Sequence, residues 1–259
     1  MLQHKSIFYG PVQSRRLGIS LGVNLQPTDA KICSFNCLYC ECGFNTGKQK
    51  ERQARLDAFT QQLEDKLITM YAEHQPLDTI TFAGNGEPTM HPKFPEIIDI
   101  TISLRNKYYP MATISVLTNS TEIHRLPVFN ALKKIDNPIL KFDSAIEKTL
   151  EIINRPVQRF HNRINPQWLV EKMACFKGNF IVQTMFLRGS FDGESFDNTT
   201  SEEVRAWLNV LCELRPRQVM IYTIARETPI STLQKVSREE LEEIAEKVRK
   251  IGIEVSISA

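Results

Sequence analysis

Apolar residues in this chain switch repeatedly between a period of two and a period near 3.6, and this alternation is the feature that most restricts the fold. Every second residue from Leu17 to Leu25 is apolar, as in a half-buried strand. Residues 56–73 instead carry an apolar stripe at helical spacing, formed by Phe59, Leu63, Leu67 and Met70. Strands that alternate with helices are joined by right-handed crossovers, and they form a parallel sheet.

The alternation continues to the end of the chain. We expect further strands at residues 79–83, 113–117, 139–142, 180–186 and 219–224, and helices at 94–107, 126–135, 167–176 and 202–214. Capping boxes at Thr200 with Glu203 and at Ser237 with Glu240 predict two helix starts. Six such β/α units predict an α/β fold, an open partial (β/α)6 barrel that forms one domain over residues 1–259. Chemistry in parallel α/β folds gathers at the carboxyl ends of the strands.

Composition narrows the function classes. The chain has 32 Lys and Arg against 30 Asp and Glu, a formal net charge of +2, which is far from the footprint of a dedicated nucleic-acid binder. The longest run without a charged residue is the fourteen residues Tyr108–Thr121, whereas a membrane span needs ~20 apolar residues. The first residues show no secretory signal. We therefore expect a cytoplasmic protein that does not contact a membrane.

Four of the six cysteines fall within ten residues: Cys33, Cys37, Cys40 and Cys42. In a reducing compartment, clustered cysteines indicate metal or redox chemistry instead of disulfides. The first three have the spacing C-x3-C-x2-C and directly follow the first expected strand. Three thiolates can hold three irons of a [4Fe–4S] cluster and leave the fourth iron open. The alternative is a zinc site closed by Cys42, for which the Cys40–Cys42 step is cramped.

The stretch from Cys33 to Cys40, with the aromatic Tyr39 before the third cysteine, resembles the cluster motif of the radical S-adenosylmethionine (SAM) superfamily. The resemblance implies a radical SAM barrel, and a [4Fe–4S] cluster and SAM as cofactors. It also implies an external electron donor of the flavodoxin or ferredoxin type. Reductive cleavage of SAM would release a 5′-deoxyadenosyl radical that abstracts hydrogen from a substrate. Cys42 lies outside the motif, either as a small residue near the cluster or in a redox or substrate role.

Polar residues stand at the ends of the later strands. Gly84-Asn85-Gly86-Glu87 follows the second strand and resembles the Gly-Gly-Glu motif that holds the SAM amino group, with Asn85 between the glycines. The resemblance further implies SAM contacts from strand ends, and the adenine contacts would fall at residues 223–225. The predicted SAM-binding residues are Gly84, Asn85, Gly86, Glu87, Thr118, Asn119, Asp143 and Gln183.

The stretches 10–18, 154–156 and 218–227 resemble the wyosine-related group of radical SAM proteins, some of which act on tRNA. The sequence has no second cysteine motif for a further cluster, so we do not transfer their reaction. Five arginines near the expected barrel ends are candidates for binding an anionic substrate such as tRNA, or else they are solvated or paired: Arg15, Arg16, Arg155, Arg188 and Arg226. A basic run is either a solvated helix start or a phosphate-binding strip: Lys48, Lys50, Arg52 and Arg55.

Two classes of function remain in competition. The first is a radical SAM enzyme, which acts on tRNA or a nucleotide-like anion, or else serves as an activase or modifies a peptide or a metabolite. The second is a non-catalytic zinc or iron–sulfur module that recognises RNA. A closed set of four ligands is hard to assemble from these cysteines, which favours the enzyme.

Overall fold

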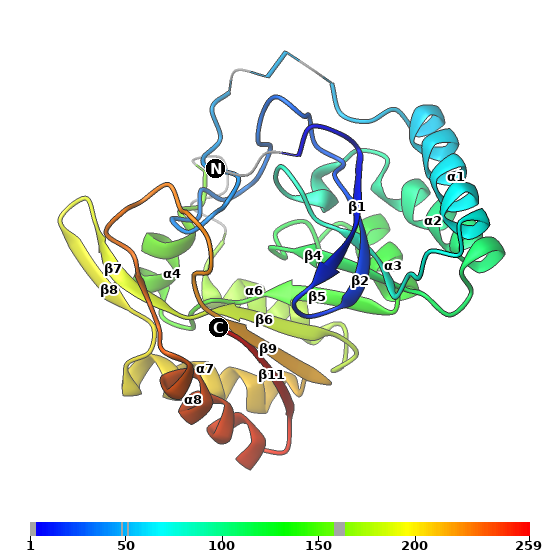
Figure 1. Cartoon of the computed structure of the whole chain (residues 1–259). Helices are drawn as coiled ribbons and strands as arrows, with labels where there is room; N and C mark the ends of the chain where they lie inside the picture. The colour runs from blue at the N-terminus through cyan, green and yellow to red at the C-terminus, as the bar shows by residue number, and fades with distance from the viewer. Residues whose placement is uncertain (1–3, 48, 51, 158–163) are drawn as a thin grey trace.

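A strongly curled eight-stranded sheet organises the computed structural model, which describes residues 4–47, 49–50, 52–157 and 164–259 (Figure 1). In spatial order its strands are β1 (Phe8–Ser14), β2 (Gly18–Val23), β3 (Thr79–Phe82), β4 (Thr113–Thr118), β5 (Asn137–Lys141), β6 (Ile181–Met185), β9 (Gln218–Tyr222) and β11 (Glu254–Ser258). Neighbours from β2 to β11 pair in parallel, and β1 pairs antiparallel with β2 at one edge. The expected open partial barrel is confirmed.

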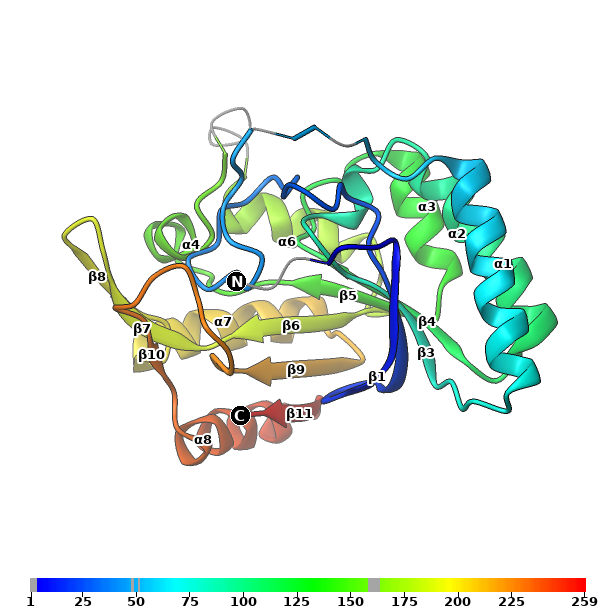
Figure 2. The same ribbon diagram turned by 45° about the horizontal axis from the view of Figure 1, so that its top comes forward.

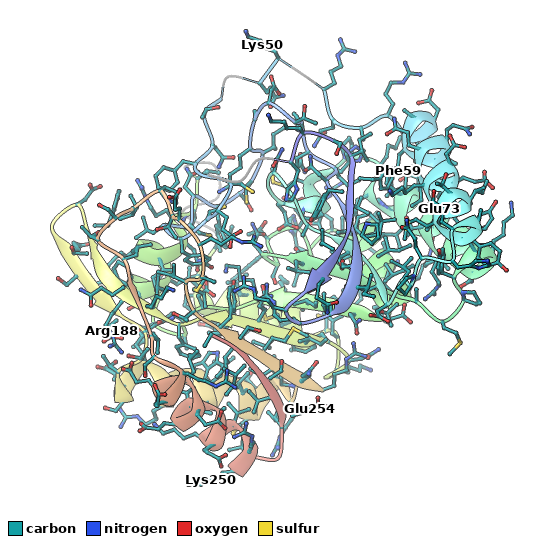
Figure 3. All side chains as sticks on the ribbon, viewed as in Figure 1. Lys50, Phe59, Glu73, Arg188, Lys250 and Glu254 are labelled. Atoms are coloured by element: carbon teal, nitrogen blue, oxygen red, sulfur yellow. The ribbon has the colours of Figure 1, made fainter. Side chains whose placement is uncertain are left out.

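The helices lie outside the curl and bury their apolar stripes against it. They are α1 (Leu56–Ala72), α2 (Phe94–Tyr108), α3 (Leu126–Lys134), α4 (Glu147–Asn154), α6 (Pro166–Ala174), α7 (Ser201–Leu214) and α8 (Arg238–Lys250). On α1 the four predicted core residues are fully buried. Figure 3 shows Phe59 between α1 and the strands, where its ring lies 5.3 Å from that of Phe8. Burial of such a stripe supplies most of a helix's stability in a domain.

The parallel pairing collects the carboxyl ends of the strands on one side of the molecule. In Figure 2 the arrows of β5, β6 and β9 end on the side where the hairpin of β7 (Leu187–Phe191) and β8 (Glu194–Asp197) projects. The loop that carries the clustered cysteines runs from β2 toward α1. This side of the sheet is therefore where the expected chemistry must lie.

One helix and four strands that the structure describes were not predicted from the sequence. Helix α4 follows β5, strand β1 precedes β2, and β7 pairs with both β8 and the short β10 (Gln234–Lys235) in a separate three-stranded sheet. The hairpin turn is Asp192-Gly193, where both residues have positive φ, 50° and 82°. An Asp-Gly pair is a typical two-residue hairpin turn, so the turn itself carried a signal in the sequence. Strand β1 contains Pro11, which disguises it as a loop.

The two predicted capping boxes, at the starts of α8 and α7, form to different extents. At Ser237 both hydrogen bonds of the box form. At Thr200 only the hydroxyl accepts from the Glu203 amide, and the Glu203 carboxylate instead accepts from the Ser144 hydroxyl at 2.7 Å. Both helix starts are confirmed, but the second half of the Thr200 box is absent among the bonds that the structure describes. None of the helices in the described part of the chain is long and apolar enough to span a membrane.

Candidate cofactor site at the carboxyl ends of the strands

The cysteine loop is irregular, yet its backbone is tied to two neighbouring segments. Ile32 donates to the Asn85 carbonyl at 3.0 Å, and its own carbonyl accepts from the Glu87 amide at 2.9 Å. Further along, the Leu38 amide donates to the Ile153 carbonyl of α4 at 2.9 Å. The Asn45 side chain accepts from the Cys33 amide at 2.9 Å. These bonds satisfy buried backbone groups and fix the positions of the cysteines.

Gly86 makes this docking possible. Its φ is +132°, and an added Cβ would lie 1.9 Å from the Ile32 carbonyl oxygen. At Gly84 an added Cβ would lie 2.4 Å from Oδ1 of Asn24. Only glycine allows another segment to approach this closely at such a backbone angle. The two glycines therefore have a structural role that does not depend on a ligand: they make room for the cysteine loop and for the Asn24 side chain.

Three cysteines and most of the predicted strand-end residues surround one pocket of about 150 Å³. Its lining includes Cys33, Cys37, Tyr39, Cys40, Gly84, Gly86, Glu87, Thr118, Asn119 and Gln183, together with Lys31 and Lys141. Asn85 and Asp143 do not line it. The Nε2 atom of Gln183 is buried and has no hydrogen-bond partner among the described residues. The pocket thus offers thiol, carboxylate, hydroxyl and amide groups from five separate segments.

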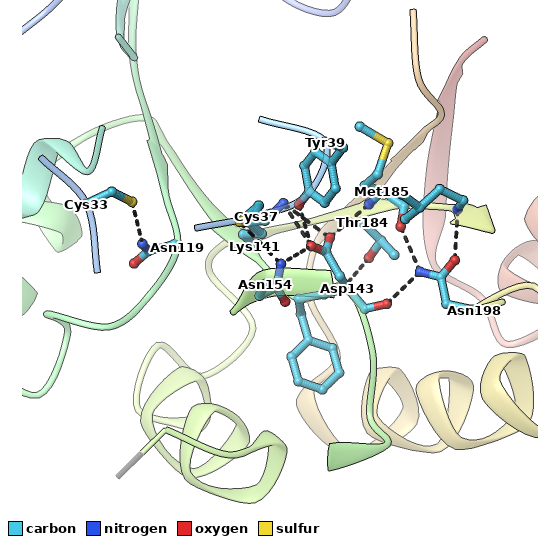
Figure 4. A network of polar contacts seen from close by, with 12 residues as sticks. Cys33, Cys37, Tyr39, Asn119, Lys141, Asp143, Asn154, Thr184, Met185 and Asn198 are labelled. Atoms are coloured by element: carbon cyan, nitrogen blue, oxygen red, sulfur yellow. Dashed lines mark hydrogen bonds and ion pairs between the residues drawn. The ribbon is translucent and has the colours of Figure 1, made fainter. Parts of the chain in front are cut away.

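The surroundings of Cys33 and Cys37 suit thiolates that are bound to a positive centre. Burial raises the pKa of the Cys33 thiol to about 12 and raises the pKa of Cys37 as well, so without a compensating charge both stay protonated. Side-chain amides point at both sulfurs: Asn119 Nδ2 lies 3.4 Å from Cys33 Sγ, and Asn154 Nδ2 lies 3.5 Å from Cys37 Sγ (Figure 4). Such donors stabilise sulfur that carries negative charge.

Lys31 brings positive charge to the same cysteines. It is buried and donates to the Gly43 carbonyl at 2.8 Å. Burial lowers its pKa, but the neighbouring Cys33, Cys40 and Cys37 outweigh this effect and raise it. The neighbouring Cys42 lowers the pKa of the Cys40 thiol. Its own thiol also reaches the Gly84 carbonyl at 3.3 Å.

These groups fit an iron–sulfur cluster better than a single metal ion. Among the described residues, no three His, Cys, Asp or Glu side chains come together in a way that could hold one ion. In a cubane each cysteine binds a different iron, so the thiolates stand around a cluster and do not converge on one point. A pocket walled by three separated thiols therefore matches the expected [4Fe–4S] group, and the zinc alternative gains no support.

Glu87 is buried at the end of β3 and accepts four hydrogen bonds. Thr89 donates its amide at 3.1 Å and its hydroxyl, the Thr118 hydroxyl donates at 2.6 Å and the Asn119 amide at 2.7 Å. Burial raises its pKa, and these donors oppose the rise by favouring the ionised form. The carboxylate holds the ends of β3 and β4 together and stands in the pocket wall, where it suits a cationic ammonium group.

Asn85 is turned away from the pocket. Its Nδ2 donates to the carbonyls of His4 and Pro27, both at 2.9 Å, and its Oδ1 accepts from the His4 amide at 2.9 Å. The residue between the two glycines thus fastens the N-terminal segment to the strand end. The predicted SAM contact at Asn85 stays a prediction, and no side-chain group of Asn85 faces the pocket lining described above.

Asp143 sits behind the pocket, at the centre of a polar network (Figure 4). Its carboxylate accepts from the Tyr39 hydroxyl, from Asn154 Nδ2 at 2.7 Å and from the Met185 amide at 3.0 Å, and it pairs with Lys141 at 2.9 Å. Lys141 also lies 4.3 Å from the centre of the Tyr39 ring. The network joins the cysteine loop to β5, α4 and β6, so Asp143 positions residues that line the pocket.

Lys31, Lys141 and Asn154 were not predicted as parts of this site. Lys141 carried a usable signal, because a lysine inside the apolar run Ile139–Phe142 is buried only when it is paired. Three of the predicted basic residues do not line this pocket and have contacts elsewhere. Arg188 pairs with Asp197 and Glu240, Arg155 lies over the Phe191 ring, and Arg55 pairs with Asp57. Lys48 lies outside the described residues, and Cys175 and Cys212 are exposed.

Known proteins resemble this chain over most of its length. A GTPase Obg of Brachyspira hyodysenteriae is 27% identical over 93% of the chain, and a UPF0026 protein of Methanocaldococcus jannaschii is 33% identical over 85%. The chain spans 33% of the first relative and 64% of the second. A UPF0026 protein of Synechocystis is 30% identical over 86% of the chain and 77% of its own length.

Solved structures share the fold. Streptococcus suis SuiB bound to S-adenosylmethionine matches with a TM-score of 0.65 and 12% identity over 92% of this chain and 50% of that one. A radical SAM methyltransferase from Sphaerobacter thermophilus matches with a TM-score of 0.67 and 14% identity over 92% and 65%. The family model of the radical SAM superfamily matches residues 29–197, which include the cysteine loop and the strand ends of the pocket. This chain belongs to the radical SAM superfamily.

Proposed function

We propose that the chain is an enzyme that cleaves SAM reductively and uses the product to abstract hydrogen from a substrate. The superfamily's cofactors are SAM and a [4Fe–4S] cluster. When both are bound, one electron from an external donor splits SAM into methionine and a 5′-deoxyadenosyl radical, which takes a hydrogen atom from the substrate. The remaining contributions come from the protein, which binds, orients and shields the reacting groups.

Cys33, Cys37 and Cys40 are the residues that would hold the cluster, since they line one pocket and have the spacing of the motif. Glu87 would accept hydrogen bonds from the SAM amino group, and Gly84, Gly86, Thr118, Asn119 and Gln183 would surround the rest of the cofactor. Asp143, which does not line the pocket, would position Tyr39 and Asn154 by accepting a hydrogen bond from each. Cys37 is buried and Cys33 is partly buried, which would limit the access of water to the ligands and protect reactive intermediates from side reactions.

The observation that carries this proposal is the meeting of three cysteines and a buried glutamate in one pocket, from segments far apart in the sequence. Its test is anaerobic reconstitution with iron and sulfide, addition of SAM and dithionite, and chromatography of the products. We expect 5′-deoxyadenosine from the wild type and from Cys175→Ala, whose thiol is exposed outside the pocket. Cys37→Ala should form none. Intact SAM in the presence of a fully loaded wild-type cluster would refute the proposal.

We further propose that the substrate is anionic, of the RNA or nucleotide type. The support is the set of arginines near the strand ends, of which Arg15, Arg16 and Arg226 gather around one cavity. A donor of the flavodoxin or ferredoxin type supplies the electron. All six cysteines are free thiols, which favours the reducing cytoplasm as the location. Retention of tRNA by the purified chain, with binding that weakens steeply as salt rises, would support the RNA assignment.

A further inference from the structure

A groove of about 410 Å³ lies between helix α4 and the tip of the β7–β8 hairpin, two segments that lie beside each other in Figures 1 and 2. On the α4 side it is lined by Lys148, Glu151, Ile152 and Arg155, whose spacing of three and four residues puts them on one face of the helix. The hairpin contributes residues around its turn. None of the lining residues lines the pocket of the three cysteines, so the groove is a separate site.

Two contacts join the walls of the groove, one near each end of α4. Lys148 Nζ lies 3.1 Å from Glu194 Oε1 of the hairpin. Arg155 is the C-cap residue of α4, and its guanidinium carbon lies 4.3 Å from the centre of the Phe191 ring. Between these contacts Ile152 supplies apolar surface. The groove has the volume of a small-molecule pocket, which measures about 300–1,000 Å³.

Arg155 is held in place while its donors stay unused. Its amide donates to the Glu151 carbonyl at 2.9 Å, and its carbonyl accepts from the Asn36 amide of the cysteine loop at 3.0 Å. Its guanidinium also lies 5.5 Å from the centre of the Phe44 ring, so it stands between two aromatic rings. Within the part of the chain that the structure describes, no acceptor bonds to its N–H groups. A guanidinium placed in this way offers a ligand both a stacking plane and a fork of donors.

The charges of the groove do not favour a phosphate group as its ligand. Lys148 and Glu194 neutralise each other, and Glu151 and Asp192 then outnumber Arg155. Neither Glu151 nor Asp192 has an ion-pair or side-chain hydrogen-bond partner among the described residues. Both carboxylates would repel a phosphate at short range. A neutral planar group suits the groove better, with N–H groups for the carboxylates and an acceptor for the arginine.

We propose that this groove binds an unstacked nucleobase of the substrate. Proteins recognise such bases by stacking them on aromatic rings and guanidinium planes and by hydrogen bonds to their edges. Phe191 and Arg155 supply the stacking surface, Arg155 donates to the acceptors of the base, and Glu151 and Asp192 accept from its N–H groups. The inference rests on the proposed function, because it deepens the RNA or nucleotide assignment. It makes the groove a recognition site outside the pocket of the three cysteines.

Equilibrium dialysis of the full chain with its cluster loaded tests this proposal, with saturating SAM and no reductant so that the cofactor site is occupied. The four ribonucleosides carry a base without phosphate, ribose 5-phosphate carries phosphate without a base, and N-acetylarginine amide represents a basic residue of a peptide. We expect at least one nucleoside to bind saturably. Its affinity should change little between about 50 and 200 mM salt, because no phosphate is contacted.

Arg155→Gln and Phe191→Leu should each weaken nucleoside binding about fivefold or more, because stacking of one base contributes at least that factor. The matched controls are Arg205→Gln and Tyr71→Leu, which remove the same kinds of side chain from exposed positions on α7 and α1 and should bind like the wild type. Phe191→Leu decides the question if Arg155→Gln does not fold.

Three results would overturn the nucleobase site. The first is that no nucleoside binds saturably, and the second is that Arg155→Gln and Phe191→Leu both bind as the wild type does. The third is that only ribose 5-phosphate or N-acetylarginine amide binds in a way that depends on Arg155, which would assign the groove to an oxyanion or to a peptide.

SAM binding and the formation of 5′-deoxyadenosine with dithionite, measured on the same samples, separate this proposal from the proposed function. If SAM is cleaved but no nucleoside binds, the proposed function stands and the nucleobase site is refuted. If a nucleoside binds in a way that depends on Arg155 but SAM is not bound, the nucleobase site stands and the proposed function fails.

Discussion

The hydroxyl of Tyr39 donates a hydrogen bond to the carboxylate of Asp143, although 104 residues separate them in the chain. Tyr39 belongs to the cysteine loop and Asp143 follows β5, so this bond joins the cysteine loop to the frame of the barrel. Since Lys141 and Asn154 contact the same carboxylate, one buried charge holds three segments in place. The stability of the fold and the geometry of the site therefore depend on the same residue.

Asp143→Ala should destabilise the protein by about 3–5 kcal/mol, because it leaves Lys141 buried without its counter-charge. The free energy of unfolding in urea measures the effect. Asp99→Asn is the matched control, since it breaks the exposed ion pair with Lys134 and should cost less than about 1 kcal/mol. Similar losses in both variants would show that Asp143 is no more important than a surface charge.

Gly86→Ala should destabilise the protein by at least about 2 kcal/mol more than Gly252→Ala. Both glycines have positive φ, +132° and +77°, but an added Cβ at Gly86 meets the Ile32 carbonyl, whereas Gly252 has nothing within 4 Å. The control thus reports backbone strain alone, about 1–2 kcal/mol, and the difference reports the clash. Urea unfolding gives both values, and iron content after reconstitution shows whether the cysteine loop still docks. Equal losses would contradict the close approach at Gly86.

Lys31→Met should shift the reduction potential of the reconstituted cluster to more negative values. A buried positive charge near Cys33, Cys37 and Cys40 favours the electron-rich state, because cluster potentials depend on local charge. A redox titration followed by electron paramagnetic resonance, without SAM, measures the shift. Lys148→Met removes an exposed lysine on α4 and should change the potential less. A potential that does not move in Lys31→Met would exclude this electrostatic role.

Glu203 provides a pH test of the packing of α7. Burial raises the pKa of its carboxyl above the ordinary 4.5. The folded state therefore binds more protons than the unfolded state, so stability falls as pH rises from 4.5 through the raised pKa. Glu203→Gln lacks this titration. The difference in unfolding free energy, wild type minus variant, should decrease between pH 4.5 and neutrality, and a difference that increases would reverse the assignment.

Periodicity predicted the strands and helices because the spacing of apolar residues differs between the two and can be read locally in the sequence. Their alternation along the chain then predicted a parallel sheet. The cysteine spacing and the strand-end residues predicted which segments form the candidate site. The directions of individual side chains were not predictable in this way. Asn85 stands between two residues that line the pocket, yet it faces His4, because the Gly86 backbone is turned to receive the cysteine loop. Such a direction depends on contacts with residues some eighty positions away.

One residue, Asn198, holds both ends of the hairpin of β7 and β8. Its side chain accepts from the Leu187 amide at 2.9 Å and donates to the carbonyls of Met185 and Asp143 at 2.8 and 2.9 Å. Asn198 therefore ties both ends of the hairpin to the ends of β5 and β6, while the pairing of β7 with β10 and the ion pair of Arg188 with Glu240 hold it from the side. The turn of the hairpin can therefore change in length or sequence while Asn198 keeps the ends of β5 and β6 in position. None of the residues of β7 and β8 lines the pocket of the three cysteines, so such changes leave the lining of that pocket intact.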